Sequence, residues 1–239
     1  MNTKYLWLLP RLIKFVIKTF GIRKRLERNR TIESIEKEKY IWSKLILKVL
    51  KVNFNPNEIN YSKGFSLDDN VLIICNHRSF LDILIMEQVV RKLHNQKSTF
   101  IAKKELKTTF FIGRVIELMN VMFIDRENPR DFINLLKDIK KKLKENPKGN
   151  SFIIFPEGTR NKIDNGVQKF KEGYFKIAEK NNLQILPIYI EGNPEKYLEE
   201  LDGSKNEIKV HIFDLVHPME TTSEEFEELY QKEIETLKN

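Results

Sequence analysis

The chain has 239 residues, of which 41% are apolar and 32% charged; this suffices for one sizeable domain with a short appendage and excludes a disordered chain. The net charge of +8 is uneven, because residues 1–52 hold fourteen Lys/Arg and four Asp/Glu, a net +10, which leaves −2 for the remainder. The single cysteine, Cys75, excludes an intramolecular disulfide and fits a reducing compartment.

The first fifty residues have the pattern of two basic amphipathic helices. Apolar residues recur every three or four positions over 5–20 and end at Gly21, a basic hinge covers 23–30, and a second helix is expected over 31–52 with Thr31 as its cap. No apolar run reaches the roughly 20 residues that span a bilayer, and the opening lacks a signal-peptide cleavage site. We therefore expect an anchor on an anionic membrane surface. The alternatives are packing of both helices on the domain and, third, nucleic-acid binding.

A polar stretch over 53–70 marks the boundary between this anchor, residues 1–52, and a domain over residues 53–239. From residue 71 onward, apolar runs of strand type alternate with amphipathic helical patterns. This alternation predicts an α/β domain whose mostly parallel central sheet is flanked by helices. The expected strands are 71–75, 98–102, 121–124, 151–155, 185–190 and 208–213, and the expected helices are 79–94, 108–119, 129–145, 169–181 and 223–237.

The first polar string, Asn76 to Asp82, directly follows an apolar strand and contains His77. Histidine is a general base near neutral pH, and a carboxylate can orient it. Helix positions five apart point about 140° apart, so His77 and Asp82 meet only if His77 precedes the helix and Asp82 lies in its first turn. Ser79 favours that break as an N-cap residue, but Ser79 and Asp82 also fit a variant of the capping box, so both interpretations remain open. Cys75 could form a nucleophile pair with His77, although a buried core residue is the better interpretation.

Two further strings end apolar strands: FPEGTR at 155–160 and FIDR at 123–126. The carboxyl ends of parallel strands meet at one edge of a sheet, where α/β folds build their sites. Arg160 could grip a phosphate in a fork geometry, and Glu157 could hold that arginine or a substrate hydroxyl. The alternative is a structural turn closed by a Glu-Arg pair.

Together these strings resemble the glycerolipid acyltransferase family, which contains the 1-acylglycerol-3-phosphate acyltransferases. The family's N-H-x-x-x-x-D block is matched at 76–82, its K-x-E-L string at 103–106, its F-I-D-R string at 123–126, its F-P-E-G-T-R block at 155–160 and its apolar-Pro-apolar strand at 186–188, all in the family order. Gly113, which follows the K-x-E-L string, also fits the family pattern. The chain departs from the family where a proline often follows K-x-E-L, and where Asn120 replaces a glycine before F-I-D-R. Both departures lie near the family's acyl tunnel and leave the acyl preference open.

The resemblance implies transfer of a fatty acyl group from acyl-CoA or acyl-carrier protein to the free hydroxyl of lysophosphatidic acid, giving phosphatidic acid in phospholipid biosynthesis. In that scheme His77 is the general base and Asp82 orients it, without a resident cofactor or metal. The acceptor lipid's phosphate and glycerol would be held by Lys103, Arg126, Glu157, Gly158, Thr159 and Arg160.

The resemblance also implies a monotopic protein on the cytoplasmic face of a membrane with anionic lipids, without a nucleic-acid partner. Alternative acceptors are another lysophospholipid, such as lysocardiolipin, or glycerol-3-phosphate. A rival of another class is a membrane-surface scaffold whose motifs no longer work.

Overall fold

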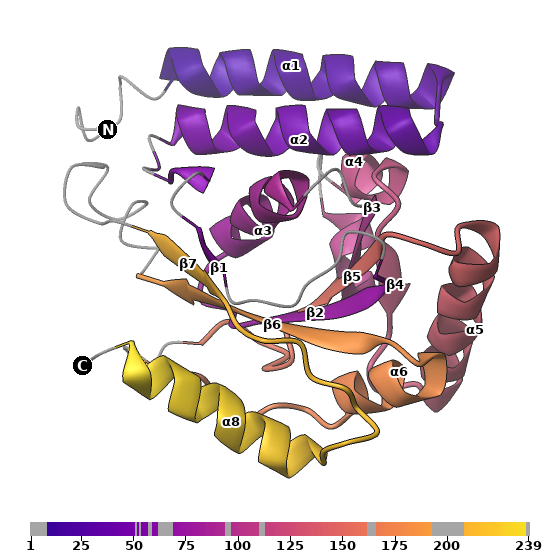
Figure 1. Ribbon diagram of the computed structural model, residues 1–239. Helices are drawn as coiled ribbons and strands as arrows, with labels where there is room; N and C mark the ends of the chain where they lie inside the picture. Colours follow the sequence, from indigo (N-terminus) through magenta and orange to yellow (C-terminus); the bar gives the residue numbers. More distant parts are fainter. Residues whose placement is uncertain are drawn as a thin grey trace.

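The computed structural model places a seven-stranded sheet at the centre of the chain (Figure 1). It describes residues 9–50, 52, 54–56, 59–61, 69–93, 97–109, 113–161, 166–192 and 208–237. From one edge to the other, the strands are β1 (Asn60–Tyr61), β7 (Lys209–Ile212), β6 (Gln184–Glu191), β2 (Val71–Cys75), β5 (Asn150–Ile154), β3 (Lys97–Lys103) and β4 (Met122–Ile124).

Most neighbouring strands run parallel, as the alternating pattern predicts. The exception among the described strands is the β6–β7 pair, which is antiparallel. Every residue of β2 is buried, because a central parallel strand is covered on both faces. Ile73 joins the core on one face, and Leu72 and Ile74 join the core on the other.

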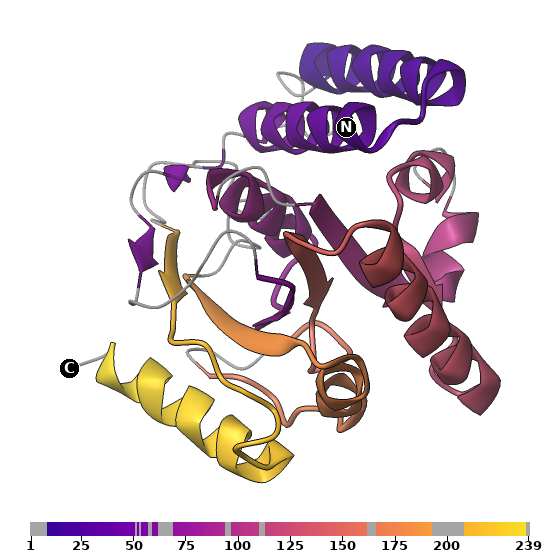
Figure 2. The ribbon, with the colours of Figure 1, turned by 45° about the vertical axis from the view of Figure 1, so that its right-hand side comes forward.

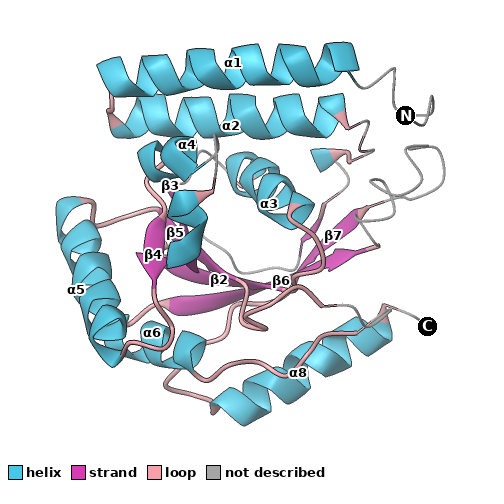
Figure 3. Cartoon of the chain, turned by 180° about the vertical axis from the view of Figure 1, so that it is seen from behind, coloured by secondary structure: helices cyan, strands magenta, loops and turns pink. Residues whose placement is uncertain are grey.

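Helices form a layer on each face of the sheet (Figures 1 and 3). The first layer contains α3 (Leu81–Lys92) and α4 (Gly113–Leu118), with α1 (Leu9–Arg28) and α2 (Ile32–Val49) stacked outside them. The 3-10 helix η3 (Lys104–Thr108) precedes α4 and has no buried residue. The second layer contains α5 (Pro129–Glu145), α6 (Gly173–Asn181) and α8 (Ser223–Thr236). The α/β architecture expected from the sequence is therefore confirmed.

The N-terminal helices differ from the expectation in where they end. The first helix does not stop at Gly21 but continues to Arg28, so the expected basic hinge is helical. Burial of Ile22 and Leu26 prolongs the apolar face and outweighs the roughly 1 kcal/mol that a glycine costs inside a helix. Thr31 caps α2 as predicted, since its side chain accepts the Ser34 N–H at 3.2 Å.

The second of these helices packs on the domain, as the packing alternative describes. Trp42 and Ile46 of α2 are buried in the same core as α3 and β2, and Figure 2 shows the α1–α2 pair lying against α3. Trp42 Nε1 also donates to Thr19 Oγ1 of α1 at 3.0 Å. No helix within the described ranges has both the length and the apolar character needed to cross a bilayer.

A buried polar cluster joins α2 to α3 and β3. Lys39 Nζ lies 2.7 Å from Glu36 Oε1 and donates to Ser98, whose hydroxyl lies 2.9 Å from Glu87 Oε2. Burial is the main cause that raises the pKa of Glu87 to about 6, and the nearby Glu36 carboxylate adds to it while Lys39 and Arg91 oppose it.

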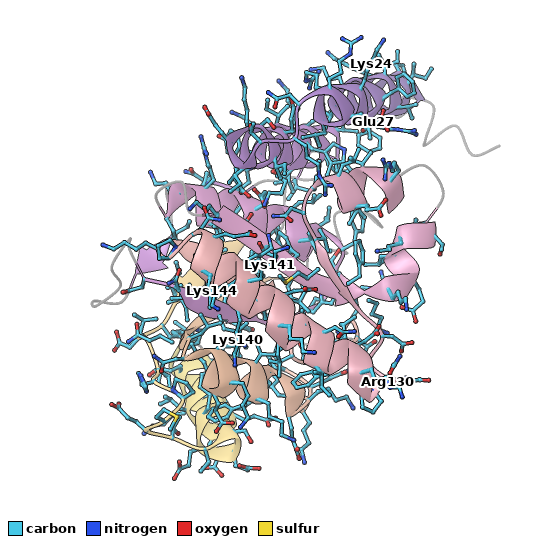
Figure 4. All side chains as sticks on the ribbon, turned by 90° about the vertical axis from the view of Figure 1, so that its right-hand side faces the viewer. Lys24, Glu27, Arg130, Lys140, Lys141 and Lys144 are labelled. Carbon is cyan, nitrogen blue, oxygen red and sulfur yellow. The ribbon has the colours of Figure 1, made fainter. Side chains whose placement is uncertain are left out.

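Two smaller differences reflect contacts that the periodicity does not reveal. The expected boundary loop contains β1, and the expected helix over 108–119 is replaced by η3 and α4. Gly113 permits the close approach of these two elements, because a Cβ there would lie 2.1 Å from the carbonyl oxygen of Lys107. At the lysine-rich end of α5, Lys140 and Lys144 are solvent-exposed and lie on its outer side (Figure 4).

Candidate active site

His77 lies in the turn between β2 and α3, and Asp82 lies in the first turn of α3. Their side chains meet, with His77 Nδ1 at 2.9 Å from Asp82 Oδ2. The geometry predicted from their spacing is therefore confirmed. The Asp82 side chain is 1% exposed and that of His77 is 17% exposed, so the pair is buried at the carboxylate end and reachable at the imidazole end.

The carboxylate of Asp82 organises the start of α3 as well as the imidazole. Asp82 Oδ2 accepts the backbone N–H of Arg78 at 2.6 Å and that of Ser79 at 2.7 Å. Three donors on one oxygen favour an ionised carboxylate, which can only accept, so the His77 proton sits on Nδ1. His77 Nε2 then has a free lone pair, and it makes no hydrogen bond within the described residues.

The predicted helix cap at Ser79 needs a correction. The helix begins at Leu81 with Phe80 at the cap position, and Ser79 Oγ accepts the N–H of Leu81 instead of that of Asp82. Half of the capping box remains, because Asp82 accepts the Ser79 N–H. The Asp82 carboxylate thus both orients His77 and caps the start of α3, so the two interpretations of the motif hold together.

Strand register brings the FPEGTR string to His77. Ile74 of β2 pairs with Ile154 of β5, and His77 and Glu157 each lie three residues beyond this pair. Glu157 Oε1 accepts the His77 backbone N–H at 2.7 Å, and Asn161 donates its N–H to the His77 carbonyl at 2.6 Å. Both backbone groups of His77 are therefore held by the FPEGTR string and the residue that follows it.

The His77 ring has its own support. It stacks on Phe155, with ring centroids 4.2 Å apart and an interplanar angle of 21°. The preceding residue, Asn76, uses its side-chain amide to pair with both backbone groups of Ile190, at 3.0 and 2.8 Å. This pairing continues the β2–β6 ladder past the end of β2 and fixes the turn in which His77 lies.

Glu157 has a structural role that the sequence does not predict, because both of its carboxylate oxygens bind backbone groups. Its second oxygen, Oε2, accepts the N–H of Gln168 at 2.8 Å, so each oxygen binds a backbone group. The residue is 1% exposed, and this burial raises the pKa of its carboxyl although both hydrogen bonds and His77 oppose that rise. Glu157 thus fastens the His77 turn to the segment before α6.

Arg126 and Gly158 form a second contact between strings. Arg126 Nη1 donates to the Gly158 carbonyl at 2.6 Å. Gly158 has a φ of +75°, and a Cβ at this position would lie 2.5 Å from Arg126 Nη1. A glycine is required here by both the backbone conformation and the space taken by the guanidinium.

A cavity of about 560 Å³ opens beside these strings, between the sheet and the α5–α6 layer. Five predicted substrate-binding residues line it: Lys103, Arg126, Glu157, Gly158 and Thr159. Its deeper wall is apolar and includes Ile124 and Ile177. Phe155, which like Glu157 contacts His77, is also part of the lining. The sixth predicted substrate-binding residue, Arg160, is exposed and is not among the lining residues of this cavity.

The cysteine and the other histidines show no catalytic arrangement among the described residues. Cys75 is fully buried, and that burial raises the pKa of its thiol well above the usual range, which fits a core residue and not a nucleophile. His211 Nε2 lies 2.8 Å from Glu191 Oε2 and His217 accepts a backbone N–H, whereas His94 lies outside the described residues. Within the described part of the chain, no three His, Cys, Asp or Glu side chains are grouped to hold a metal.

Sequence reasoning missed several residues that support the site. Asn161 and Phe155 fix His77, and Lys171 lines the cavity. Asn161 directly follows the FPEGTR string, and Lys171 lies two residues before a helix that starts with glycine, but neither has a spacing that singles it out. Their roles depend on contacts between segments far apart in the sequence.

Comparisons with known proteins point in one direction. A family model described as Acyltransferase matches residues 53–191. A 1-acyl-sn-glycerol-3-phosphate acyltransferase of Helicobacter pylori is 38% identical over 138 residues, covering 57% of this chain and 55% of the relative. A probable enzyme of that name from Mycoplasma genitalium is 34% identical over 158 residues, covering 62% of this chain and 57% of the relative. The chain therefore spans slightly more than half the length of these curated relatives.

A solved structure extends the similarity to nearly the whole fold. The crystal structure of the 1-acyl-sn-glycerophosphate (LPA) acyltransferase PlsC from Thermotoga maritima matches with a TM-score of 0.69 at 25% sequence identity. The match covers 98% of this chain and 96% of that chain.

Proposed function

The chain belongs to the acyltransferase family, and on that premise we propose that it acylates lysophosphatidic acid to give phosphatidic acid. The acyl donor is a thioester, acyl-CoA or acyl-carrier protein. The observation that carries the proposal is the 2.9 Å contact between His77 Nδ1 and Asp82 Oδ2, which leaves Nε2 available as a base. The names of the relatives support lysophosphatidic acid as the acceptor lipid.

The reaction needs one proton to move twice. His77 Nε2 takes the proton of the lipid hydroxyl as its oxygen attacks the thioester carbonyl carbon. Asp82 stabilises the imidazolium that forms, because its carboxylate faces the Nδ1–H. The tetrahedral intermediate then expels the thiolate, which takes the proton from Nε2. The lipid hydroxyl is itself the nucleophile, so this scheme uses no protein nucleophile, metal or resident cofactor.

Lys103 and Arg126 hold the phosphate of the acceptor lipid in this proposal. Both line the same cavity, and Arg126 is fixed by its bond to the Gly158 carbonyl. Gly158 and Thr159 form the turn beneath that phosphate. Holding the phosphate fixes the distance from the lipid hydroxyl to His77, which removes much of the entropic part of the barrier.

The acceptor is tested with a panel of lipids. The protein is incubated with acyl-CoA or acyl-carrier protein and with lysophosphatidic acid, lysocardiolipin or glycerol-3-phosphate, and products are identified by mass. The proposal predicts phosphatidic acid as the main product. Preferential acylation of another lipid on the panel would reassign the acceptor, and absence of any acyl transfer would favour the scaffold alternative.

We also propose that residues 1–52 form a membrane-binding hairpin attached to the domain over 53–239, on the cytoplasmic face. The support is a stripe on the outer side of α1, where four large apolar residues at helical spacing are exposed: Ile13, Val16, Ile17 and Phe20 are 53%, 45%, 65% and 58% exposed. A stripe of this kind beside basic residues suits insertion at the headgroup level of anionic lipids.

The membrane proposal calls for point variants, because deleting 1–52 would remove buried core residues of α2. The double substitution Ile17→Glu and Phe20→Glu should abolish co-flotation with anionic liposomes. Ile133→Glu, at an apolar residue on α5 that is 51% exposed, is the matched control and should leave flotation intact. Unchanged flotation of the double variant would refute this role for α1.

A further inference from the structure

Three cationic side chains line the cavity beside the site, and each comes from a different part of the fold. Lys103 ends β3, Arg126 follows β4, and Lys171 precedes α6. The first two belong to strings that the family resemblance covers. Lys171 lies outside all of those strings, and its position in the cavity raises the question of what a third cation adds.

The local geometry fixes Lys171 next to Arg126. The Lys171 backbone N–H donates to the Pro156 carbonyl at 2.9 Å, which ties it to the FPEGTR turn. A Cβ built on Gly158 would lie 3.5 Å from Lys171 Cγ and 2.5 Å from Arg126 Nη1. The lysine stem and the guanidinium therefore flank the same bare glycine, with no side chain between them.

Within the described part of the chain, none of these three residues is paired directly with a carboxylate, although the charge of Glu105 acts on Arg126. No ion pair joins Lys103, Arg126 or Lys171 to a described carboxylate, whereas two neighbouring lysines are paired: Lys104 with Asp131 at 3.6 Å and Lys176 with Glu172 at 3.5 Å. Like charges collected at one opening repel one another unless an anion binds between them. The opening is thus suited to a ligand with more than one negative charge.

Phosphomonoesters and phosphodiesters differ in charge, so a site with three cations can distinguish between them. A phosphomonoester carries roughly −1.5 to −2 charges near neutral pH and has three oxygens to accept hydrogen bonds. A phosphodiester has one titratable oxygen fewer and therefore a smaller charge. The apolar inner wall, which includes Ile101, Ile124 and Ile177, favours a ligand with a hydrocarbon chain over a small water-soluble phosphate.

We propose that Lys171 is a phosphate-binding residue that makes this cavity selective for a lipid with a phosphomonoester head over one with a phosphodiester head. This inference rests on the proposed function and names the residue that separates lysophosphatidic acid from diester lysolipids. Lys103 and Arg126 bind the phosphate of either class. Lys171 adds a third contact, and this contact is stronger with the monoester because the monoester carries more negative charge.

The test compares kinetics with a monoester and a diester acceptor. Lys171→Gln should raise KM for lysophosphatidic acid about tenfold or more, the effect of losing one hydrogen bond to a charged group, with kcat nearly unchanged. KM for lysophosphatidylglycerol, a diester, should change less than about threefold. Lys171→Arg keeps the charge and should retain most of the selectivity.

Lys169→Gln is the matched control, because it removes the same charge two residues away on the same segment, where Lys169 lines a groove with α8 instead of this cavity. It should leave both KM values unchanged. Equal effects of Lys171→Gln on both lipids, or effects no larger than those of Lys169→Gln, would overturn the inference.

Calorimetric binding of a short-chain lysophosphatidic acid separates this inference from the proposed function. A weaker affinity in Lys171→Gln than in Lys169→Gln supports the phosphate contact even if the wild type shows no turnover, an outcome that would remove the proposed acyl transfer alone. Equal affinities in the two variants would refute the contact between Lys171 and the phosphate, even if the wild type acylates lysophosphatidic acid.

Discussion

Substituting Glu157 tests whether the FPEGTR string acts on catalysis by holding the backbone of His77. In Glu157→Gln, the single carbonyl oxygen can serve either the His77 N–H or the Gln168 N–H, and the side-chain NH2 then faces the other donor. A buried N–H left without an acceptor costs roughly 1–3 kcal/mol, and the remaining bond loses its charge assistance, about 1 kcal/mol more. Because a neutral amide is easier to bury than a carboxylate whose pKa burial already raises, we expect a net loss of about 2 kcal/mol in the free energy of unfolding.

The catalytic effect should exceed what that loss of stability explains. A displacement of His77 by about 1 Å lowers the rate roughly 100-fold, so kcat should fall by that order while most of the variant stays folded. The assays are urea unfolding and acyl-transfer kinetics below the transition. Glu172→Gln is the control, since Glu172 is an exposed carboxylate directly before α6, outside the contacts that hold His77. A Glu157→Gln variant as stable and as active as Glu172→Gln would refute the reasoning.

Three more substitutions have definite expected outcomes. Asp82→Asn should lower kcat about 10²- to 10⁴-fold with little change in KM, because the amide no longer secures the Nδ1–H tautomer of His77; a loss below tenfold would contradict this role. Gly158→Ala forces a Cβ to within 2.5 Å of Arg126 Nη1, so KM for the acceptor lipid should rise at least about tenfold, and an unchanged KM would place the phosphate elsewhere. Folding raises the pKa of Glu87 from 4.5 to about 6, so the contribution of Glu87 to the free energy of unfolding is full below pH 4.5 and is lost as the pH rises through 6. Glu87→Gln should therefore remove about 2 kcal/mol from the pH dependence of stability, which denaturant titrations at pH 4.5 and 7 would measure. An identical pH dependence in the variant and the wild type would contradict this expectation.

The sequence predicts the catalytic geometry because that geometry is local. His77 and Asp82 are five residues apart, and the requirement that they meet allows one arrangement of turn and helix, which the structure has. The strands also follow from local signals, since a run such as Val71–Cys75 is continuously apolar. The helix does not begin directly after Ser79 as predicted. The Asp82 carboxylate accepts the backbone N–H groups of both Arg78 and Ser79, whereas a simple capping box would use only that of Ser79.

The supporting contacts are not local, and no spacing in the sequence reveals them. Glu157 reaches His77 across 80 residues, and that contact depends on β2 lying next to β5 in the register that pairs Ile74 with Ile154. The length of α1 likewise depends on tertiary packing, since the burial of Ile22 carries the helix through Gly21. Strand β1 is two residues long and pairs at the edge of the sheet, too short for any periodicity.

The most direct test of the central claim is the release of free thiol from an acyl thioester in the presence of lysophosphatidic acid, measured for the wild type and for His77→Ala. If His77 is the general base, the wild type should release thiol in step with phosphatidic acid formation, and the variant should be slower by about 10²- to 10⁴-fold while remaining folded. Equal rates in the two proteins would show that the His77–Asp82 pair is not the catalytic centre.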